Sequence, residues 1–240
     1  MLTLSNDTIA SLDAIQIARD VRCISDWLFG KFEQWFRQIG AGHHDVARSV
    51  RRIQQWSETR ALRRNKDIRM LALMSLTQGT FFYADPRFAG TFDRVVRQFE
   101  LEPDARLDSI YKAFDGWRRE VVGLDGWTAI ADRTALLLKD DAFLGIASPE
   151  DIVACVFPEQ SSWVGEVEQK HFISAVIDQG RRMALPTRRH HACHMAISTL
   201  LGYRWTIDPK LTCVADHLLS EKDPVKASLG IAQKLTEKLC

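Results

Sequence analysis

The apolar positions of the chain recur at helical spacing, and one pattern occurs twice. In each half, a run of mostly apolar residues ends at a glycine, and a short aromatic segment then leads to an Asp-Pro pair. Ala, Leu and Met dominate both runs, which predicts helices that are covered on most sides. The two copies, residues 61–88 and 184–211, align without a gap at an offset of 123 residues. The first includes the apolar run 68–76, Gly79 and Asp85-Pro86, and the second includes the run 191–201, Gly202 and Asp208-Pro209.

The residues after each run predict how the two helices end. Gly79 and Gly202 fit a C-terminal cap, where a residue without a Cβ can take a positive φ. Asp85 and Asp208 can accept hydrogen bonds from the free N–H groups of the next helix, whose first position suits the following proline. Both aspartates are thereby explained structurally, without a catalytic role.

Helical spacing continues through the rest of the chain, and no alternating strand pattern occurs. The expected fold is all-α: a multi-helix body built from two tandemly duplicated helical units, residues 1–122 and 126–240, which could pack as one globular domain. His43 and His44 are expected in a loop before a helix that Asp45 caps, and Gly180 is expected to end a helix over 163–179. Further helices are expected over 8–38, 65–78, 86–99, 103–117, 128–139 and 209–219, and after Ser148, Thr187 and Asp223.

The net charge and the cysteine content limit the classes of partner and the cellular compartment that we expect. The chain has 32 Lys and Arg against 31 Asp and Glu, and this net charge of +1 argues against a general binder of nucleic acid or acidic membranes. Five cysteines, an odd number without a CxxC pair, indicate a reducing compartment. No secretory signal is seen, and no stretch approaches the roughly 20 apolar residues of a membrane span. We therefore expect a cytoplasmic protein.

Basic and aromatic residues supply the candidates for partner binding. Aromatic residues near the N-terminus are expected to pack in the core, although such side chains also anchor interfaces. The most basic segment, residues 48–69, fits a solvated surface first, with phosphate binding and docking of an acidic protein surface as alternatives. The candidate partner-binding residues are Trp35, Arg48, Arg51, Arg52, Trp56, Arg63, Arg64, Trp163 and Trp205.

Three histidines close together in the sequence form the most distinctive candidate for a metal site. On a helix, His190 and His194 share a face, and His191 and His194 are also neighbours. Imidazoles at this spacing can bind zinc or another transition metal, with Cys193 or a distant carboxylate assisting. No glutamate lies between them as in HExxH, and the first half has no histidine at the equivalent positions. Polar packing within the helix is therefore favoured over a metal site.

Motifs of common catalytic sites are missing from the sequence. It contains no P-loop, GxGxxG, GxSxG or Cys-His signature. The adjacent Asp140 and Asp141 point apart on a helix or loop, which is poor geometry for an acid/base pair. We therefore expect a protein that is not an enzyme and has no cofactor.

The start of the chain and the surroundings of both apolar helices carry a resemblance to a known group of proteins. The residues are Met1-Leu2-Thr3-Leu4-Ser5, Arg60-Ala61-Leu62, Lys66-Asp67-Ile68, Gly79 and Asp85-Pro86-Arg87-Phe88, and then Gly180, Ala184-Leu185, Leu201-Gly202 and Asp208-Pro209. This set resembles small helical proteins that many Gram-negative bacteria encode beside type VI secretion spike and effector genes. The resemblance covers roughly half of the chain and rests on structural motifs. The chain departs from it by carrying two copies and by having Ser57 where a glycine is expected, and no catalytic residue is carried over.

The resemblance implies a cytoplasmic accessory protein of an effector module. We expect first an immunity protein that binds and neutralises a cognate secreted toxin. An effector chaperone or adaptor for type VI secretion is the second expectation, and a metal-binding enzyme or sensor that uses the histidine cluster is the third. The expected partner is a cognate effector or toxin protein, without nucleic acid or membrane, and the oligomeric state stays open.

Overall fold

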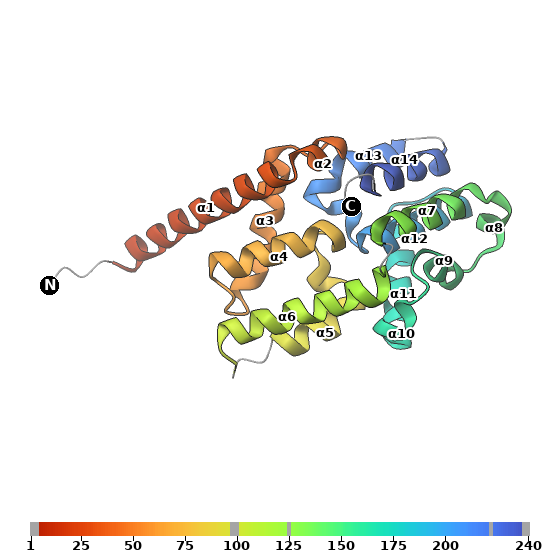
Figure 1. Cartoon of the computed structure of the whole chain (residues 1–240). Helices are drawn as coiled ribbons and strands as arrows, with labels where there is room; N and C mark the ends of the chain where they lie inside the picture. Colours follow the sequence, from red (N-terminus) through yellow and green to blue (C-terminus); the bar gives the residue numbers. More distant parts are fainter. Residues whose placement is uncertain (1–4, 97–100, 124–125, 221–222, 237–240) are drawn as a thin grey trace.

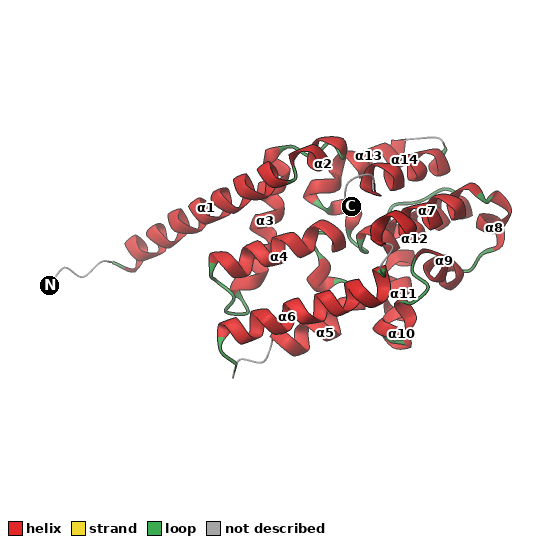
Figure 2. Ribbon diagram, viewed as in Figure 1, coloured by secondary structure: helices red, strands yellow, loops and turns green. Residues whose placement is uncertain are grey.

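The computed structural model describes residues 5–96, 101–123, 126–220 and 223–236, which form an all-α fold without a strand in these ranges (Figures 1 and 2). The all-α prediction is confirmed. The longer helices are α1 (Asn6–Lys31), α3 (His43–Glu58), α4 (Asn65–Gln78), α5 (Pro86–Val96), α6 (Pro103–Trp117), α7 (Gly126–Lys139), α11 (Glu166–Arg182), α12 (Arg188–Leu201) and α14 (Pro224–Thr236). Shorter elements are α2 (Glu33–Gln38), η1 (Phe82–Ala84), η2 (Arg118–Val122), α8 (Asp141–Ile146), α9 (Pro149–Val156), α10 (Gln160–Val164), η3 (Trp205–Ile207), η4 (Pro209–Leu211) and α13 (Thr212–Ser220).

Several helices begin and end where their caps predict. α4 covers the predicted residues 65–78. α9 begins after Ser148, whose hydroxyl accepts a hydrogen bond from the Asp151 N–H at 3.1 Å, and α12 begins after Thr187, which accepts from the His190 N–H at 3.3 Å. α5 is described as far as Val96, so its predicted end at Phe99 lies outside the described residues. The start of α1 projects from the body (Figure 1).

The predictions for the start of α3 were wrong in detail. His43 and His44 form the first turn of this helix rather than a loop, and its N-cap is Gly42. Asp45 is the third residue of the helix, and its carboxylate accepts a hydrogen bond from the Gly42 N–H at 2.8 Å. The acidic side chain therefore acts one turn later than predicted, where it still satisfies a free backbone N–H.

The prediction for Gly180 was also wrong. The predicted helix over 163–179 is broken at Gly165, which has a φ of +94°, and α11 then continues through Gly180 to Arg182. A Cβ at Gly180 would lie 2.8 Å from Nδ1 of His191. The absence of that Cβ lets α11 and α12 pack closely, which is a reason for glycine that helix-end rules do not anticipate.

The two apolar helices α4 and α12 end against each other. Gly79 and Gly202 both have positive φ, +77° and +93°, as predicted. A Cβ on Gly79 would lie 2.6 Å from the Leu201 carbonyl oxygen, and a Cβ on Gly202 would lie 2.7 Å from that of Gln78. Each glycine therefore makes room for the backbone of the other half.

The two Asp-Pro aspartates bind across the same junction. Asp208 accepts hydrogen bonds from the backbone N–H and the hydroxyl of Thr80, at 2.6 and 2.7 Å. Asp85 accepts from the Tyr203 N–H at 3.2 Å. Each aspartate also accepts, at 3.0 Å, from the N–H two residues along its own chain, that of Arg87 or of Lys210. The predicted capping role is therefore only half of what these carboxylates do.

Each aspartate is accompanied by a buried cation. The Arg87 guanidinium is 2.8 Å from Asp85 and donates to the Thr199 carbonyl at 2.7 Å. The Lys210 ammonium is 3.5 Å from Asp208 and donates to the Thr80 hydroxyl at 2.5 Å. Burial lowers the pKa of Lys210, and the Asp208 carboxylate opposes this. Arg87 and Lys210 thus occupy matching positions, 123 residues apart.

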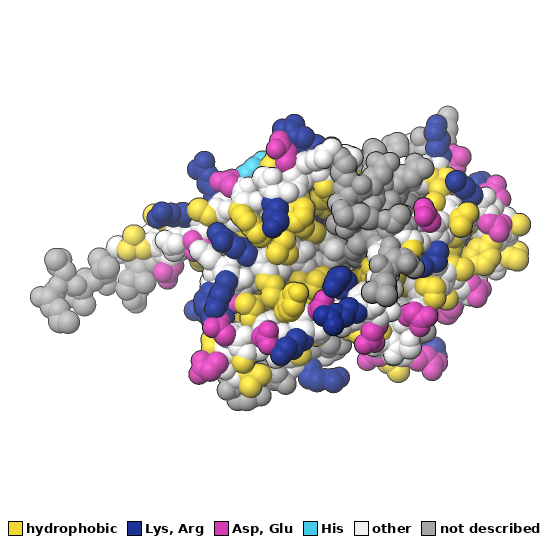
Figure 3. Space-filling view, viewed as in Figure 1, with side chains coloured by type: hydrophobic (Ala, Val, Ile, Leu, Met, Phe, Trp, Pro, Cys, Tyr) yellow, Lys and Arg dark blue, Asp and Glu magenta, His cyan; other side chains and the backbone are white. Residues whose placement is uncertain are grey.

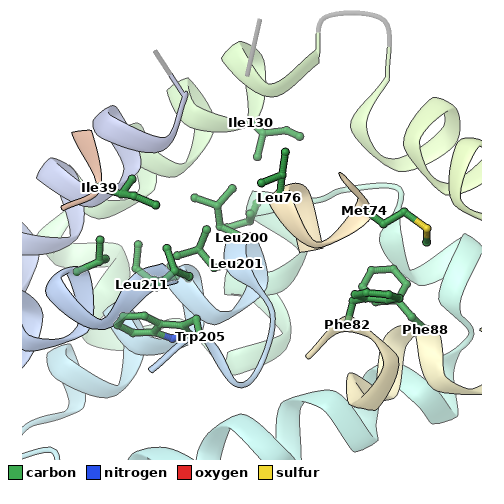
Figure 4. Packing of buried hydrophobic residues seen from close by; sticks show 14 of the residues in the cluster. Ile39, Met74, Leu76, Phe82, Phe88, Ile130, Leu200, Leu201, Trp205 and Leu211 are labelled. Carbon is green, nitrogen blue, oxygen red and sulfur yellow. The ribbon is translucent and has the colours of Figure 1, made fainter. Parts of the chain in front are cut away.

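One buried apolar cluster runs through both halves. Figure 4 shows Phe82 beside Phe88 in the first half, and Trp205 near Leu211 at the matching positions of the second. These paired positions agree with the offset of the sequence pattern, while descent by tandem duplication and the unit boundaries at 122 and 126 stay predictions.

The surface carries mixed charge. On the face shown in Figure 3, Lys and Arg side chains lie among Asp and Glu rather than in one field. Among the described helices, none combines the length and the apolar character needed to cross a membrane.

Candidate functional site: a basic and aromatic face

Helix α3 separates an apolar side from a basic side. Val46, Val50 and Ile53 are fully buried. Arg48, Arg51 and Arg52 fall on the other side of the same helix and are exposed. The spacing of residues in the sequence therefore places three predicted partner-binding arginines on one surface ridge.

Two grooves flank this ridge. One, of about 560 Å³, lies between α3 and the η3–η4 segment, and its wall includes Arg48, Arg52 and Ile207. The other, of about 530 Å³, lies between α1 and α3. His44 and Arg51 line both grooves, so they form the crest between them. A ridge with a hollow on each side offers shape as well as charge to a partner.

Aromatic rings continue the face beyond the end of α3. Trp56 is itself buried, 8% exposed, and supports the face from beneath. Its ring stacks on the half-buried Tyr83 with centroids 4.7 Å apart, and the Arg60 guanidinium lies 4.5 Å from the Trp56 ring centre. Arg204, from the second half, lies 5.1 Å from the Tyr203 ring centre. These contacts hold two arginine side chains against aromatic rings.

Positive charges from both halves converge on Tyr83. Partial burial raises the pKa of the Tyr83 phenol, and the charges of Arg204, Arg52 and Arg60 act in the opposite direction. Arg48 pairs with Asp45 at 2.7 Å, whereas Arg51 and Arg52 make no ion pair with any residue in the described ranges. We call this surface the basic–aromatic face; it comprises His44, Arg48, Arg51, Arg52, Trp56, Arg60, Tyr83, Arg204 and Ile207.

Several predicted partner-binding residues lie elsewhere. Trp35 and Trp205 are core residues, 4% and 1% exposed, so a partner cannot reach them in this conformation. Trp163 belongs to α10 and lies against Phe88 with ring centroids 6.1 Å apart. None of the three contributes to the basic–aromatic face.

The arginines just before α4 are also separate from the face. Arg64 pairs with the buried Asp67 at 2.8 Å and with Asp104 of α6 at 2.5 Å, so it joins two helices. Its bond to Asp67 raises the pKa of Arg64. Arg63 is exposed in the turn that precedes α4. Of the predicted set, the structure therefore brings together Arg48, Arg51, Arg52 and Trp56.

Five residues of the face were not among the candidate partner-binding residues: His44, Arg60, Tyr83, Arg204 and Ile207. Tyr83 and Arg204 lie in the short segments after Gly79 and Gly202, which were interpreted only as links between helices. The sequence did contain a signal for Tyr83 and Arg204, because both links carry aromatic residues and align at the offset of 123 residues. Ile207 is 60% exposed, and the sequence shows only an apolar residue beside an Asp-Pro pair.

The three histidines, for which polar packing was favoured over a metal site, have different surroundings on α12. Nδ1 of His190 is 2.7 Å from the Thr187 hydroxyl. His194 is buried, whereas His191 lies at the edge of a cavity described below. Among the described residues, no group of three or more His, Cys, Asp or Glu side chains is placed to hold a metal ion.

Comparison with known proteins gives no match: no protein-family model, curated protein or solved structure is similar to the chain. The site must therefore be interpreted from its own chemistry.

Proposed function

We propose that the basic–aromatic face binds an acidic surface of a partner protein, and that this partner is a cognate toxin which the protein neutralises. The observation that carries the proposal is the convergence of Arg52, Arg60 and Arg204 on the stacked pair of Trp56 and Tyr83. The toxin as partner rests on the resemblance to proteins encoded beside effector genes.

The composition of the face suits a protein interface. Tyrosine and arginine are among the residues most enriched in binding energy, and the buried Trp56 holds Tyr83 and Arg60 in place beneath the surface. Arg60 and Arg204 already lie against aromatic rings, so they lose less side-chain freedom when a partner binds. Ile207 supplies an exposed apolar contact beside the arginines.

Charge supplies the preference for an acidic partner. The guanidinium groups of Arg51 and Arg52 are exposed and have no carboxylate partner among the described residues. Such charges speed the encounter with an acidic surface and disfavour a basic one, and their effect weakens as salt rises. We therefore expect the association rate to fall with ionic strength.

The test measures both the survival of the producing cell and the affinity of the protein for its partner. The protein is co-expressed with the product of each neighbouring gene, cell survival is scored, and the dissociation constant of any complex is measured. Reversing two unpaired charges, Arg51→Glu with Arg52→Glu, should weaken binding about 100-fold and abolish protection. A control with the same change of net charge reverses two exposed arginines of η2 that pair with Asp115, Arg118→Glu with Arg119→Glu, and should retain both activities.

Three outcomes would overturn the proposal in different ways. If the protein neither binds nor protects against any neighbouring product, the proposed function is wrong. If both double variants bind equally well, the face is wrong. If the protein binds an effector without protecting the cell, and its deletion blocks secretion, the adaptor role replaces immunity.

A further inference from the structure

A cavity in the second half is separate from the basic–aromatic face. It has a volume of about 120 Å³ and lies where α9, α11 and α12 meet. Most of its wall is apolar, but one wall residue is a histidine; the wall includes Ile152, Val176, Ile177, Ala192, His194 and Met195.

His194 is a buried polar group without a partner. Its side chain is 1% exposed, and neither ring nitrogen makes a hydrogen bond to any residue in the described ranges. One neighbour is the Trp205 ring, whose centroid is 5.8 Å away. Because buried polar groups in proteins are nearly always hydrogen-bonded, an unpaired imidazole on a cavity wall needs an explanation.

The ring is neutral at ordinary pH. Burial, assisted by the neighbouring His191, lowers the pKa of His194 to about 4, and the backbone of Val176 opposes this more weakly. A neutral imidazole has one N–H donor and one acceptor nitrogen. Even if the Val176 carbonyl engaged the N–H, the acceptor nitrogen would remain free.

The first half has no such group at the matching positions. His191 and His194 correspond to Ile68 and Leu71, and Leu71 is fully buried in the core. Apolar packing therefore suffices at this place in the fold. Only the second half has a buried histidine at this place, which points to a use of His194 beyond folding.

We propose that this cavity binds a small uncharged molecule with a hydroxyl group, which hydrogen-bonds to His194. An apolar protein cavity of about 150 Å³ accepts benzene. The cavity here is of similar size and opens to the surface where the exposed Arg188 lines it, so a single ring with one substituent is the largest ligand expected. A hydroxyl can donate to the free ring nitrogen or accept from its N–H, and the carbon skeleton can contact the apolar wall.

The rim of the cavity favours an uncharged ligand. Arg188 lines it and donates hydrogen bonds to the Ile146 and Ala147 carbonyls, at 2.8 and 3.2 Å. Those bonds tie the connection between α8 and α9 to α12. An anion would have to displace these two carbonyls from the Arg188 guanidinium, and a cation would lie beside the positive charge of Arg188.

Phenol and toluene are suitable probes, because they have the same shape and differ by a hydroxyl in place of a methyl. Their dissociation constants are measured by calorimetry on the full chain. In His194→Phe the phenol-to-toluene affinity ratio should fall about fivefold, which corresponds to about 1 kcal/mol. The control His171→Phe, an exposed histidine of α11, should leave that ratio unchanged.

A second measurement needs no variant. Phenol should shift a ring-nitrogen NMR signal of His194 in the unaltered protein, and toluene should not. The proposal is overturned if phenol does not bind, if the affinity ratio is the same in His194→Phe, or if the ring-nitrogen signals stay unchanged at saturating phenol. None of these results bears on toxin binding.

Discussion

The junction between α4 and α12 predicts a large effect from adding a single methyl group. In Gly79→Ala, the new Cβ would lie 2.6 Å from the Leu201 carbonyl oxygen. The backbone of Gly79 has φ +77° and ψ 161°, a conformation that essentially only glycine adopts. The substitution therefore meets both a backbone penalty and a steric one.

The two penalties can be estimated separately. Holding a residue in this backbone region costs about 1–3 kcal/mol. Forcing an extra carbon into a packed contact costs a further 1–3 kcal/mol, roughly. We expect Gly79→Ala to lower the free energy of unfolding by about 4 kcal/mol. Gly116→Ala, in α6 with no atom near the new Cβ, should instead raise it by about 0.5–1 kcal/mol.

The matching glycine provides a sharper test. Gly202→Ala should have a similar cost, because its Cβ would lie 2.7 Å from the Gln78 carbonyl oxygen. The backbone penalties of the two sites are independent, but one separation of the two helix ends relieves both clashes. The double variant should therefore lose about 6 kcal/mol rather than about 8 kcal/mol.

Urea unfolding followed by circular dichroism measures these differences. If a variant is too unstable in buffer, the unaltered protein and all four variants can be compared in a fixed concentration of a stabilising osmolyte. A loss below about 1 kcal/mol in Gly79→Ala would refute the close approach of the helix ends. Strict additivity in the double variant would refute the shared contact.

Two further predictions concern buried ionisable groups. Lys210→Met leaves the Asp208 carboxylate buried without its cation, so urea unfolding should show a loss of about 3–5 kcal/mol, whereas Lys170→Met, at an exposed pair with Glu166, should change little. His194 has a folded pKa of about 4, below the ordinary value of 6.5, so the unfolded chain binds its proton first as pH falls. Between pH 6.5 and 4 this group should remove about 3 kcal/mol of stability, a loss that His194→Phe should lack when the two unfolding curves are compared.

Local signals in the sequence predicted much of the fold. Helix starts at Ser148-Pro149 and after Thr187, and the positive φ at Gly79 and Gly202, depend on hydrogen bonds within a few residues. Such short-range chemistry can be inferred from residue types alone. The same holds for the basic side of α3, because helical spacing determines which residues share a face.

Long-range contacts account for what the sequence could not show. Gly180 was expected to end a helix, since nothing nearby reveals that His191 packs against it. Trp35 and Trp205 were candidate anchors, although their burial depends on elements far away in the chain. Tyr83 and Arg204 are 121 residues apart, and only the folded chain brings Arg204 to the Tyr83 side of the junction.

The junction that joins the two halves also assembles the proposed binding face. Tyr83 lies in the segment that follows Gly79, and Arg204 lies in the segment that follows Gly202. Asp208 holds the first segment through Thr80, and Asp85 holds the second through Tyr203. Since each segment is anchored by the aspartate of the other half, neither half alone can place Arg204 beside Arg52 and Arg60 around Tyr83. A substitution that opens the junction should therefore weaken partner binding even where the protein stays folded.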